Sequence, residues 1–313
     1  MHRGERLAAV DMGTNSIRLL VAEVRQREEE PVELARDMVI TRLGRGVDRT
    51  GRLDPASLAR TLEVLGWYAW RAKALGVRRI KVGATSAVRD AAEREELFSG
   101  VRALTGAEPE VLTGEREAAL SFLGATRGLD APTPYLVLDI GGGSTEAVVG
   151  TGSAERAISV DVGSVRITER VAPVDPPHAT EVEAMRAAAA AGLAPAFARI
   201  PAGSAATLVA VAGTATTVQA IALGLERYDP DAIHRTTLHR RTVEETARRL
   251  AAMTTAERAA LPVMVPGRED VIVAGVQILL EAMERWGFER CLVSERDILD
   301  GLLLEMAALA SAE

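Results

Sequence analysis

Two short segments of the sequence combine aspartate, glycine and hydroxyl side chains in the same order. Residues 11–16 read Asp-Met-Gly-Thr-Asn-Ser, and residues 139–145 read Asp-Ile-Gly-Gly-Gly-Ser-Thr. Glycines allow several backbone N–H groups to converge on one oxyanion, and hydroxyl groups add further donors. Both segments therefore predict phosphate-binding loops, with the candidate ligands Gly13, Thr14, Asn15, Ser16, Gly141, Gly142, Gly143, Ser144 and Thr145.

Three carboxylates accompany the two loops. Asp11 and Asp139 precede the glycines, and Glu146 follows the second loop. Because carboxylate oxygens are preferred ligands of Mg²⁺, we expect Asp139, Glu146 and Asp11 to hold Mg²⁺, with Mn²⁺ as an alternative. One cysteine, Cys291, and four histidines without ligand spacing exclude a zinc framework.

A third segment, residues 84–90, reads Ala-Thr-Ser-Ala-Val-Arg-Asp and follows an expected strand at residues 79–83. It places Thr85, Ser86 and Arg89 at the start of a helix. Backbone N–H groups favour an anion there, and an arginine can bind phosphate through two hydrogen bonds. An ordinary helix cap with a solvent-facing arginine is equally consistent with this segment alone.

A fourth segment, residues 112–118, places Glu115 and Glu117 in the first turn of an expected helix. Acidic side chains are common at helix starts because they interact favourably with the helix dipole. Side chains two residues apart point in different directions on a helix. We therefore expect at most one of these glutamates to face the other candidate residues.

The elements around these segments alternate between helices and strands, which indicates an α/β fold. Each aspartate-glycine segment lies between two apolar runs, as in a β-hairpin. Because this hairpin occurs twice, the simplest architecture is two similar α/β domains that face each other across an active-site cleft. The turn-rich residues 127–134 predict the boundary, giving domains 1–128 and 129–313. Expected helices begin at Asp54-Pro55 and at residues 113–115, and cover about 87–104, 180–197, 242–253, 269–287 and 297–310.

One uncharged run, residues 200–225, is long enough to span a bilayer. Pro201 and Gly213 interrupt it, so we expect a buried strand at residues 207–212, a glycine turn and the start of a helix. The Gly213 turn could hold the distal part of a nucleotide or simply pack, and for Arg268 we favour a structural role.

The composition is that of a globular chain. Its 313 residues are 48% hydrophobic and 26% charged, which is enough for two cores. A formal net charge of −7 disfavours DNA and RNA as partners. The N-terminus has no secretory pattern, so we expect a cytoplasmic protein without a membrane partner, and a homodimer as the default assembly.

Taken in order, these motifs resemble those of the exopolyphosphatase/guanosine pentaphosphate phosphatase (Ppx/GppA) family. The family belongs to the sugar kinase, actin and chaperone ATPase superfamily. Residues 9–16 resemble the family's first phosphate loop, residues 84–89 its arginine-bearing turn, and residues 139–146 its second phosphate loop. The resemblance spans essentially the whole chain and implies two ribonuclease H-like (actin-like ATPase) domains.

The resemblance also assigns a catalytic residue. The family's catalytic glutamate lies in a Ser-Gly-x-Glu-Glu-Ala segment, which aligns with residues 113–118 and places Glu117 at the catalytic position. This chain departs from the pattern at Thr113, in place of serine, and at Arg116, in place of the first glutamate. The second change could alter substrate preference.

The activity implied by the resemblance is hydrolysis of the terminal phosphoanhydride of inorganic polyphosphate, of pppGpp, or of both. Glu117 would act as general base for the attacking water. The helical C-terminal extension of longer family members is absent, so we expect short polyphosphate chains or pppGpp as substrate. Two alternatives stay open: a kinase or ATPase of the same superfamily that seats adenosine at the Gly213 turn, and a sensor that binds pppGpp or polyphosphate without turnover.

Overall fold

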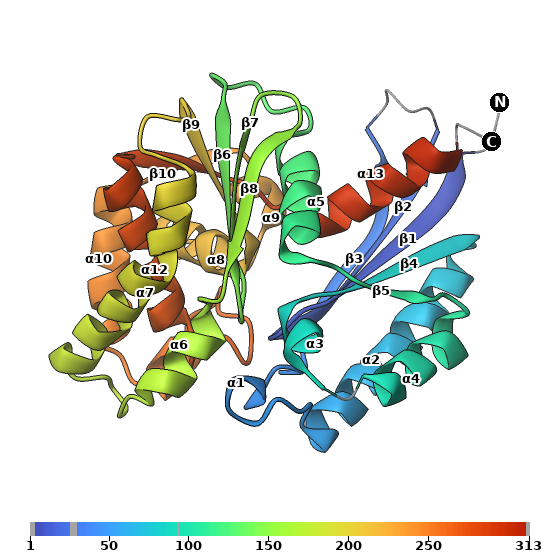
Figure 1. Ribbon diagram of the computed structural model, residues 1–313, viewed down its shortest axis with the longest axis horizontal. Helices are drawn as coiled ribbons and strands as arrows, with labels where there is room; N and C mark the ends of the chain where they lie inside the picture. The colour runs from blue at the N-terminus through green and yellow to red at the C-terminus, as the bar shows by residue number, and fades with distance from the viewer. Residues whose placement is uncertain (1–3, 26–29, 93, 311–313) are drawn as a thin grey trace. The chain divides into compact units, whose positions relative to one another are not determined.

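The chain forms two compact units in the computed structural model, which describes residues 4–25, 30–92 and 94–310. Unit 1 comprises residues 1–124 and 298–313, and unit 2 comprises residues 125–297. Each unit contains one sheet flanked by helices (Figure 1). The division differs from the expected 1–128 and 129–313, because the last helix, α13 (Ile298–Ala310), packs on the sheet of unit 1. Across the described residues, no helix has the length and apolar character needed to cross a membrane.

The sheet of unit 1 has the strand order β3-β2-β1-β4-β5. The antiparallel strands are β1 (Glu5–Met12), β2 (Ser16–Val24) and β3 (Val32–Ile40), whereas β4 (Arg79–Ala84) and β5 (Pro109–Val111) run parallel to β1. The remaining helices of the unit are α1 (Val47–Thr50), α2 (Pro55–Ala74), α3 (Ser86–Asp90), α4 (Glu95–Thr105) and α5 (Gly114–Thr126). The single helix expected over residues 87–104 is wrong, because extended backbone at Ala91 separates α3 from α4.

Alternate side chains of β1 enter two different cores, one on each face of the sheet. Val10 and Met12 pack with Tyr68 of α2. Leu7 points to the opposite face, where it packs with Leu302 of α13. This alternation follows from the two-residue period of a strand, and it explains why consecutive residues from Leu7 to Val10 are all apolar.

Unit 2 repeats this arrangement. Its strand order is β10-β11-β9-β6-β7-β8, so that β8-β7-β6-β9-β11 corresponds to β3-β2-β1-β4-β5 with β10 added at one edge. The prediction of two similar ribonuclease H-like α/β domains is thereby confirmed. The strands are β6 (Tyr135–Ile140), β7 (Thr145–Gly150), β8 (Ala154–Val160), β9 (Thr207–Val211), β10 (Thr236–His239) and β11 (Arg290–Val293). The helices are α6 (Ser164–Val171), α7 (Ala179–Arg199), α8 (Ala212–Ala222), α9 (Pro230–Ile233), α10 (Arg240–Ala251), α11 (Thr255–Ala259) and α12 (Ile272–Trp286).

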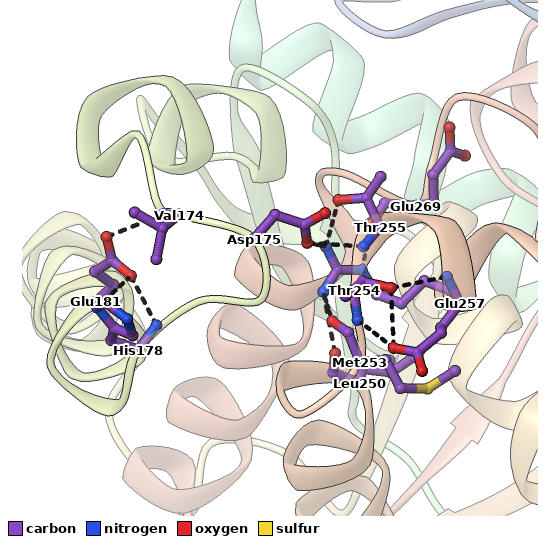
Figure 2. A network of polar contacts seen from close by, with 11 residues as sticks. Val174, Asp175, His178, Glu181, Leu250, Met253, Thr254, Thr255, Glu257 and Glu269 are labelled. Atoms are coloured by element: carbon purple, nitrogen blue, oxygen red, sulfur yellow. Dashed lines mark hydrogen bonds and ion pairs between the residues drawn. The ribbon is translucent and has the colours of Figure 1, made fainter.

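A buried arginine, Arg258 of α11, joins three segments of unit 2. Figure 2 shows three residues of these segments, Leu250, Met253 and Glu269. Its guanidinium donates hydrogen bonds to the backbone oxygens of Leu250 (3.1 Å), Met253 (2.7 Å) and Glu269 (2.6 Å). The first two carbonyls belong to the end of α10 and the turn that follows, where backbone oxygens lack partners within the helix. Arg258 therefore supplies hydrogen-bond donors to the carbonyl oxygens at the end of α10.

We predict that Arg258→Met destabilises unit 2 by about 3 kcal/mol, because three carbonyl oxygens, one of them in a buried hydrogen bond, lose a charged donor. The matched control is Arg241→Met, since the Arg241 side chain is 87% exposed and pairs with Glu245 on the same helix; we expect it to change stability by less than about 0.5 kcal/mol. Urea unfolding followed by circular dichroism measures both. Equal effects of the two substitutions would contradict the assigned role of Arg258.

Candidate functional site

Three of the candidate segments converge at one edge of the unit 1 sheet. In the parallel register, Met12 of β1 pairs with Ala84 of β4, and Ala84 pairs with Val111 of β5. The pairing continues past the strand ends, where Thr85 N–H donates to the Met12 carbonyl (3.2 Å) and Leu112 N–H donates to the Ala84 carbonyl (2.9 Å). The first glycine loop, the start of α3 and the start of α5 consequently lie together.

The first glycine loop, residues 13–16, is held by backbone hydrogen bonds. Gly13 N–H donates to the Ser16 carbonyl (2.9 Å), which closes the turn between β1 and β2. The carbonyl of Thr14 accepts a hydrogen bond from Gly44 N–H (2.8 Å), and that of Asn15 accepts from Arg42 N–H (2.9 Å). The segment that follows β3 thus fixes the loop from outside.

Two side-chain oxygens at this edge are buried without a hydrogen-bond partner in the part of the chain that the structure describes. They are the amide oxygen of Asn15 and the hydroxyl of Ser86, which lies at the start of α3. An unsatisfied buried polar group costs about 1–3 kcal/mol, so a hydrogen bond from either oxygen to a bound group would be favourable. Both positions were singled out in the sequence.

Asp11 has a partner that the sequence analysis missed. Arg18 of β2 lies directly opposite Asp11 in the hairpin and donates two hydrogen bonds, at 3.0 and 2.8 Å, to one carboxylate oxygen. The signal was present in the sequence, because hairpin register places residues 11 and 18 side by side on one face of the sheet. The guanidinium neutralises the charge of the Asp11 carboxylate, so Asp11 fits a metal site less well than expected.

Arg89 and Glu117 form an ion pair at the centre of this edge. One guanidinium nitrogen of Arg89 lies 2.5 Å from Oε2 of Glu117 and 2.9 Å from the backbone oxygen of Leu112. Glu117 is 9% exposed. A neighbouring guanidinium stabilises the charged form of a carboxyl group, and the charged form is the one that can accept a proton.

The other two charged residues of the α5 start point elsewhere. Glu115 is exposed, which agrees with the expectation that only one glutamate faces the candidate residues. Arg116 forms ion pairs with Glu305 of α13 and Glu110 of β5. Its partners are therefore carboxylates of its own unit.

The second glycine loop, residues 141–144, repeats the geometry of the first. Gly141 N–H donates to the Ser144 carbonyl (3.0 Å), which is the same turn closure as that of Gly13. The carbonyls of Gly142 and Gly143 accept hydrogen bonds from residues of α6, including Nε of Arg166 (2.8 Å). No sequence signal marked Arg166. The loop is held by α6 in the way that the first loop is held by the segment after β3.

Asp139 and Glu146 are direct cross-strand neighbours in the β6–β7 hairpin. Both are buried, at 7% and 1% exposure, and Ser159 Oγ donates to Glu146 Oε1 (2.7 Å). Opposed residues share one face of a sheet, so two carboxylates lie together where a divalent cation could neutralise them. Mg²⁺ commonly uses one or two protein carboxylates together with substrate phosphates. No cluster of three or more potential metal ligands occurs among the described residues, and Asp139 and Glu146 fit a two-carboxylate site.

The Gly213 turn is filled by a side chain of its own unit. Arg268 is buried and donates to the Gly213 carbonyl (3.1 Å) and to Oγ1 of Thr217 (2.6 Å). A methyl group on Gly213 would overlap with this guanidinium. These contacts support a structural role for Arg268 and a packing role for Gly213. The strand ends at Val211 and α8 begins at once at Ala212, without the glycine turn that was expected.

Comparison with known proteins gives matches along the whole chain. The model of the Ppx/GppA phosphatase family matches residues 20–310. Exopolyphosphatase 2 of Mycobacterium tuberculosis (strain CDC 1551 / Oshkosh) is 42% identical over 314 residues, covering 96% of this chain and 98% of that protein. The crystal structure of an exopolyphosphatase-like protein has a TM-score of 0.92 at 34% identity and covers 97% of this chain and 99% of its own. A Ppx/GppA family member from Aquifex aeolicus has a TM-score of 0.82 at 29% identity and covers 99% of both chains.

The packing of the second glycine loop gives a test that needs no ligand. Gly163 precedes α6, and a methyl group there would overlap with the backbone of Gly142 and Gly143. The φ angle of Gly163 is −156°, which alanine adopts freely, so any effect is steric. We predict that Gly163→Ala destabilises unit 2 by about 1–3 kcal/mol. Gly152→Ala is the control, because no atom lies within 4 Å of the added methyl group. Thermal unfolding that ranks the two variants the other way round would refute this assignment.

Proposed function

The chain belongs to the Ppx/GppA phosphatase family, and we propose that it removes the terminal phosphate from inorganic polyphosphate, from pppGpp, or from both. The observation that carries this proposal is the ion pair between Arg89 and Glu117. It joins a cation suited to a phosphate group with a carboxylate suited to activating water. A glycine loop with the same turn closure occurs in each unit, at Gly13 and at Gly141.

In the proposed reaction, Glu117 accepts a proton from water as the water oxygen attacks the terminal phosphorus. The bond between that phosphorus and the bridging oxygen breaks, which releases orthophosphate and the shortened substrate. Phosphoryl transfer depends mainly on positioning and on stabilising negative charge. Arg89 supplies such stabilisation when the terminal phosphate takes over its hydrogen bond from Glu117, and the exchange leaves the carboxylate facing the water.

A divalent cation fits this proposal, and Asp139 and Glu146 are the residues that would hold it. When bound, Mg²⁺ or Mn²⁺ neutralises charge on phosphoryl oxygens. The backbone N–H groups of the second loop, at Gly142 and Gly143, are suited to binding phosphate. The expected role of Asp11 as a third ligand stays a prediction, as do the homodimer and the cytoplasmic location.

The kinase alternative receives less support from the geometry. It required the Gly213 turn as a seat for adenosine, and the Arg268 guanidinium lies against that glycine. The sensor alternative would not require a carboxylate next to the phosphate-binding arginine, and Glu117 is present there. The comparison with known proteins favours polyphosphate as the substrate, because this chain is similar to Exopolyphosphatase 2 of M. tuberculosis over 98% of that protein's length.

We predict that Glu117→Gln lowers kcat for phosphate release by about 10²–10⁴-fold, the usual contribution of a general base. Binding of the substrate should persist, since the amide keeps the shape of the side chain. The measurement is orthophosphate release in the presence of Mg²⁺ from pppGpp, ATP and polyphosphates of defined length, together with calorimetric binding.

Glu115→Gln is the matched control, because Glu115 lies in the same helical turn and is exposed. Its activity should equal that of the wild type. If Glu117→Gln and the wild type release phosphate equally fast, Glu117 is not the base. If the wild type binds pppGpp or polyphosphate and releases no phosphate, the protein is a sensor and the hydrolase proposal fails.

A separate prediction concerns Arg89. Arg89→Gln should raise KM for polyphosphate by about 10-fold or more, because a hydrogen bond to a charged group contributes about 1.5–3 kcal/mol. Arg102→Gln is the control, since Arg102 is a partly exposed arginine paired with Glu95 and Glu108 on the surface of the same unit. Initial rates over a range of polyphosphate concentrations measure both variants, and an unchanged KM for Arg89→Gln would exclude Arg89 from phosphate binding.

A further inference from the structure

Four charged side chains of unit 1 form a closed network of alternating charge, which we call the four-charge network. Its members are Lys81 of β4, Glu110 of β5, Arg116 of α5 and Glu305 of α13. Lys81 Nζ lies 2.7 Å from Oε2 of Glu305 and 2.9 Å from Oε2 of Glu110. Arg116 contacts the same two carboxylates, Glu110 at 3.5 Å and Glu305 through a nitrogen that reaches both of its oxygens. Each acid therefore touches both bases.

The network is partly shielded from solvent, with side-chain exposures between 22% and 37%. Burial alone would raise the pKa of the Glu305 carboxyl, but hydrogen bonds from Arg116 and Lys81 hold that pKa below its ordinary value. The hydrogen bond with Glu305 raises the pKa of Arg116 against the opposing effect of burial. Both shifts favour the charged forms of Glu305 and Arg116, and a network of several charges contributes more than an isolated surface pair.

Arg116 immediately precedes Glu117 in the first turn of α5. Successive side chains of a helix point about 100° apart, so the same turn is attached on two sides. Arg116 joins it to α13 and β5, and Glu117 joins it to Arg89. A rotation of α5 about its own axis would move both side chains together.

Apolar contacts also connect α5 with α13. Leu120 of α5 packs with Leu299 and Leu302 of α13. At Gly301 the two helices approach so closely that a methyl group would overlap with the Leu120 carbonyl. These contacts set the separation of the helices, whereas the ion pair between Arg116 and Glu305 lies one turn nearer to the start of α5, beside Glu117.

We propose that Arg116 and Glu305 are positioning residues, which hold the first turn of α5 so that the Glu117 carboxylate lies at the correct distance from Arg89. This inference rests on the proposed function of Glu117 as general base. A base must meet its water within a narrow range of distance and angle, and a displacement of about 1 Å can cost 10²-fold in rate. Under this proposal, arginine at position 116 acts on the rate of the chemical step and leaves substrate preference unchanged.

The test uses Arg116→Gln and Glu305→Gln, which remove either half of the pair. Each should lower kcat for polyphosphate hydrolysis by about 10-fold, in line with the cost of a poorly supported catalytic group, with KM changed less than about twofold. The double variant should be no slower than the slower single variant, because both substitutions remove one interaction. Arg116→Lys keeps the charge and should restore most of the rate.

The matched control is Arg79→Gln. Arg79 also borders α13 in unit 1, but its partners are Glu5 and the backbone oxygen of Met306. Its kcat should equal that of the wild type. An unchanged kcat in both Arg116→Gln and Glu305→Gln overturns the proposal. A raised KM with unchanged kcat also overturns it, because Arg116 would then contact substrate.

A second readout separates this inference from the proposed function. The Glu117 amide donates to the Thr113 carbonyl in the first turn of α5 (2.9 Å), and hydrogen exchange reports the stability of that bond. Exchange in residues 114–118 should be faster in Arg116→Gln and Glu305→Gln than in the wild type or Arg79→Gln. If the wild type releases no phosphate, the hydrolase proposal fails while the exchange experiment still decides whether the network holds the turn. Identical exchange in all four proteins overturns the inference.

Discussion

The parallel pairing of β1, β4 and β5 is the constraint on which the candidate site of unit 1 depends. The first glycine loop, Arg89 and Glu117 are far apart in the sequence, and they meet because the three strands end at one edge of the sheet. Backbone hydrogen bonds that continue past the strand ends fix where, along the strand direction, the segments after β4 and β5 leave the sheet. A slip of one residue in the pairing of β4 with β5 would turn the side chains of the shifted strand to the other face and separate Arg89 from Glu117.

Helix α5 shows how one short element can serve several purposes at once. Glu117 points to Arg89, Arg116 points to Glu305, and Leu120 packs against α13 at Gly301. Arg116 and Leu120 are four residues apart and therefore lie on the same face of the helix, the one that contacts α13, whereas the Glu117 side chain points about 100° away from that of Arg116. The chemistry assigned to Glu117 is therefore supported by an ionic contact and an apolar contact between α5 and α13.

Much of this arrangement follows from sequence patterns that have a direct structural cause. The repeated hairpin predicts two similar domains because a glycine and a serine three residues apart close both turns in the same way, as the Gly13 and Gly141 hydrogen bonds show. The meeting of Arg89 and Glu117 required the parallel register, which no local pattern contains. Arg166 and the filling of the Gly213 turn by Arg268 depend on tertiary packing. The return of α13 to unit 1 was missed because an apolar helix fits either core equally well by its pattern alone.

The two hairpins share a backbone but differ in charge. Opposite Asp11 the first hairpin carries Arg18, whereas opposite Asp139 the second carries Glu146. The first pair has no net charge, and the second pair consists of two acids. The two hairpins therefore differ in their affinity for ions. Exchanging Arg18 and Glu146 between them would make the first hairpin the one that attracts a cation, and the main-chain hydrogen bonds of both turns would stay in place. One side chain in each hairpin is thus enough to give two copies of the same backbone different charges.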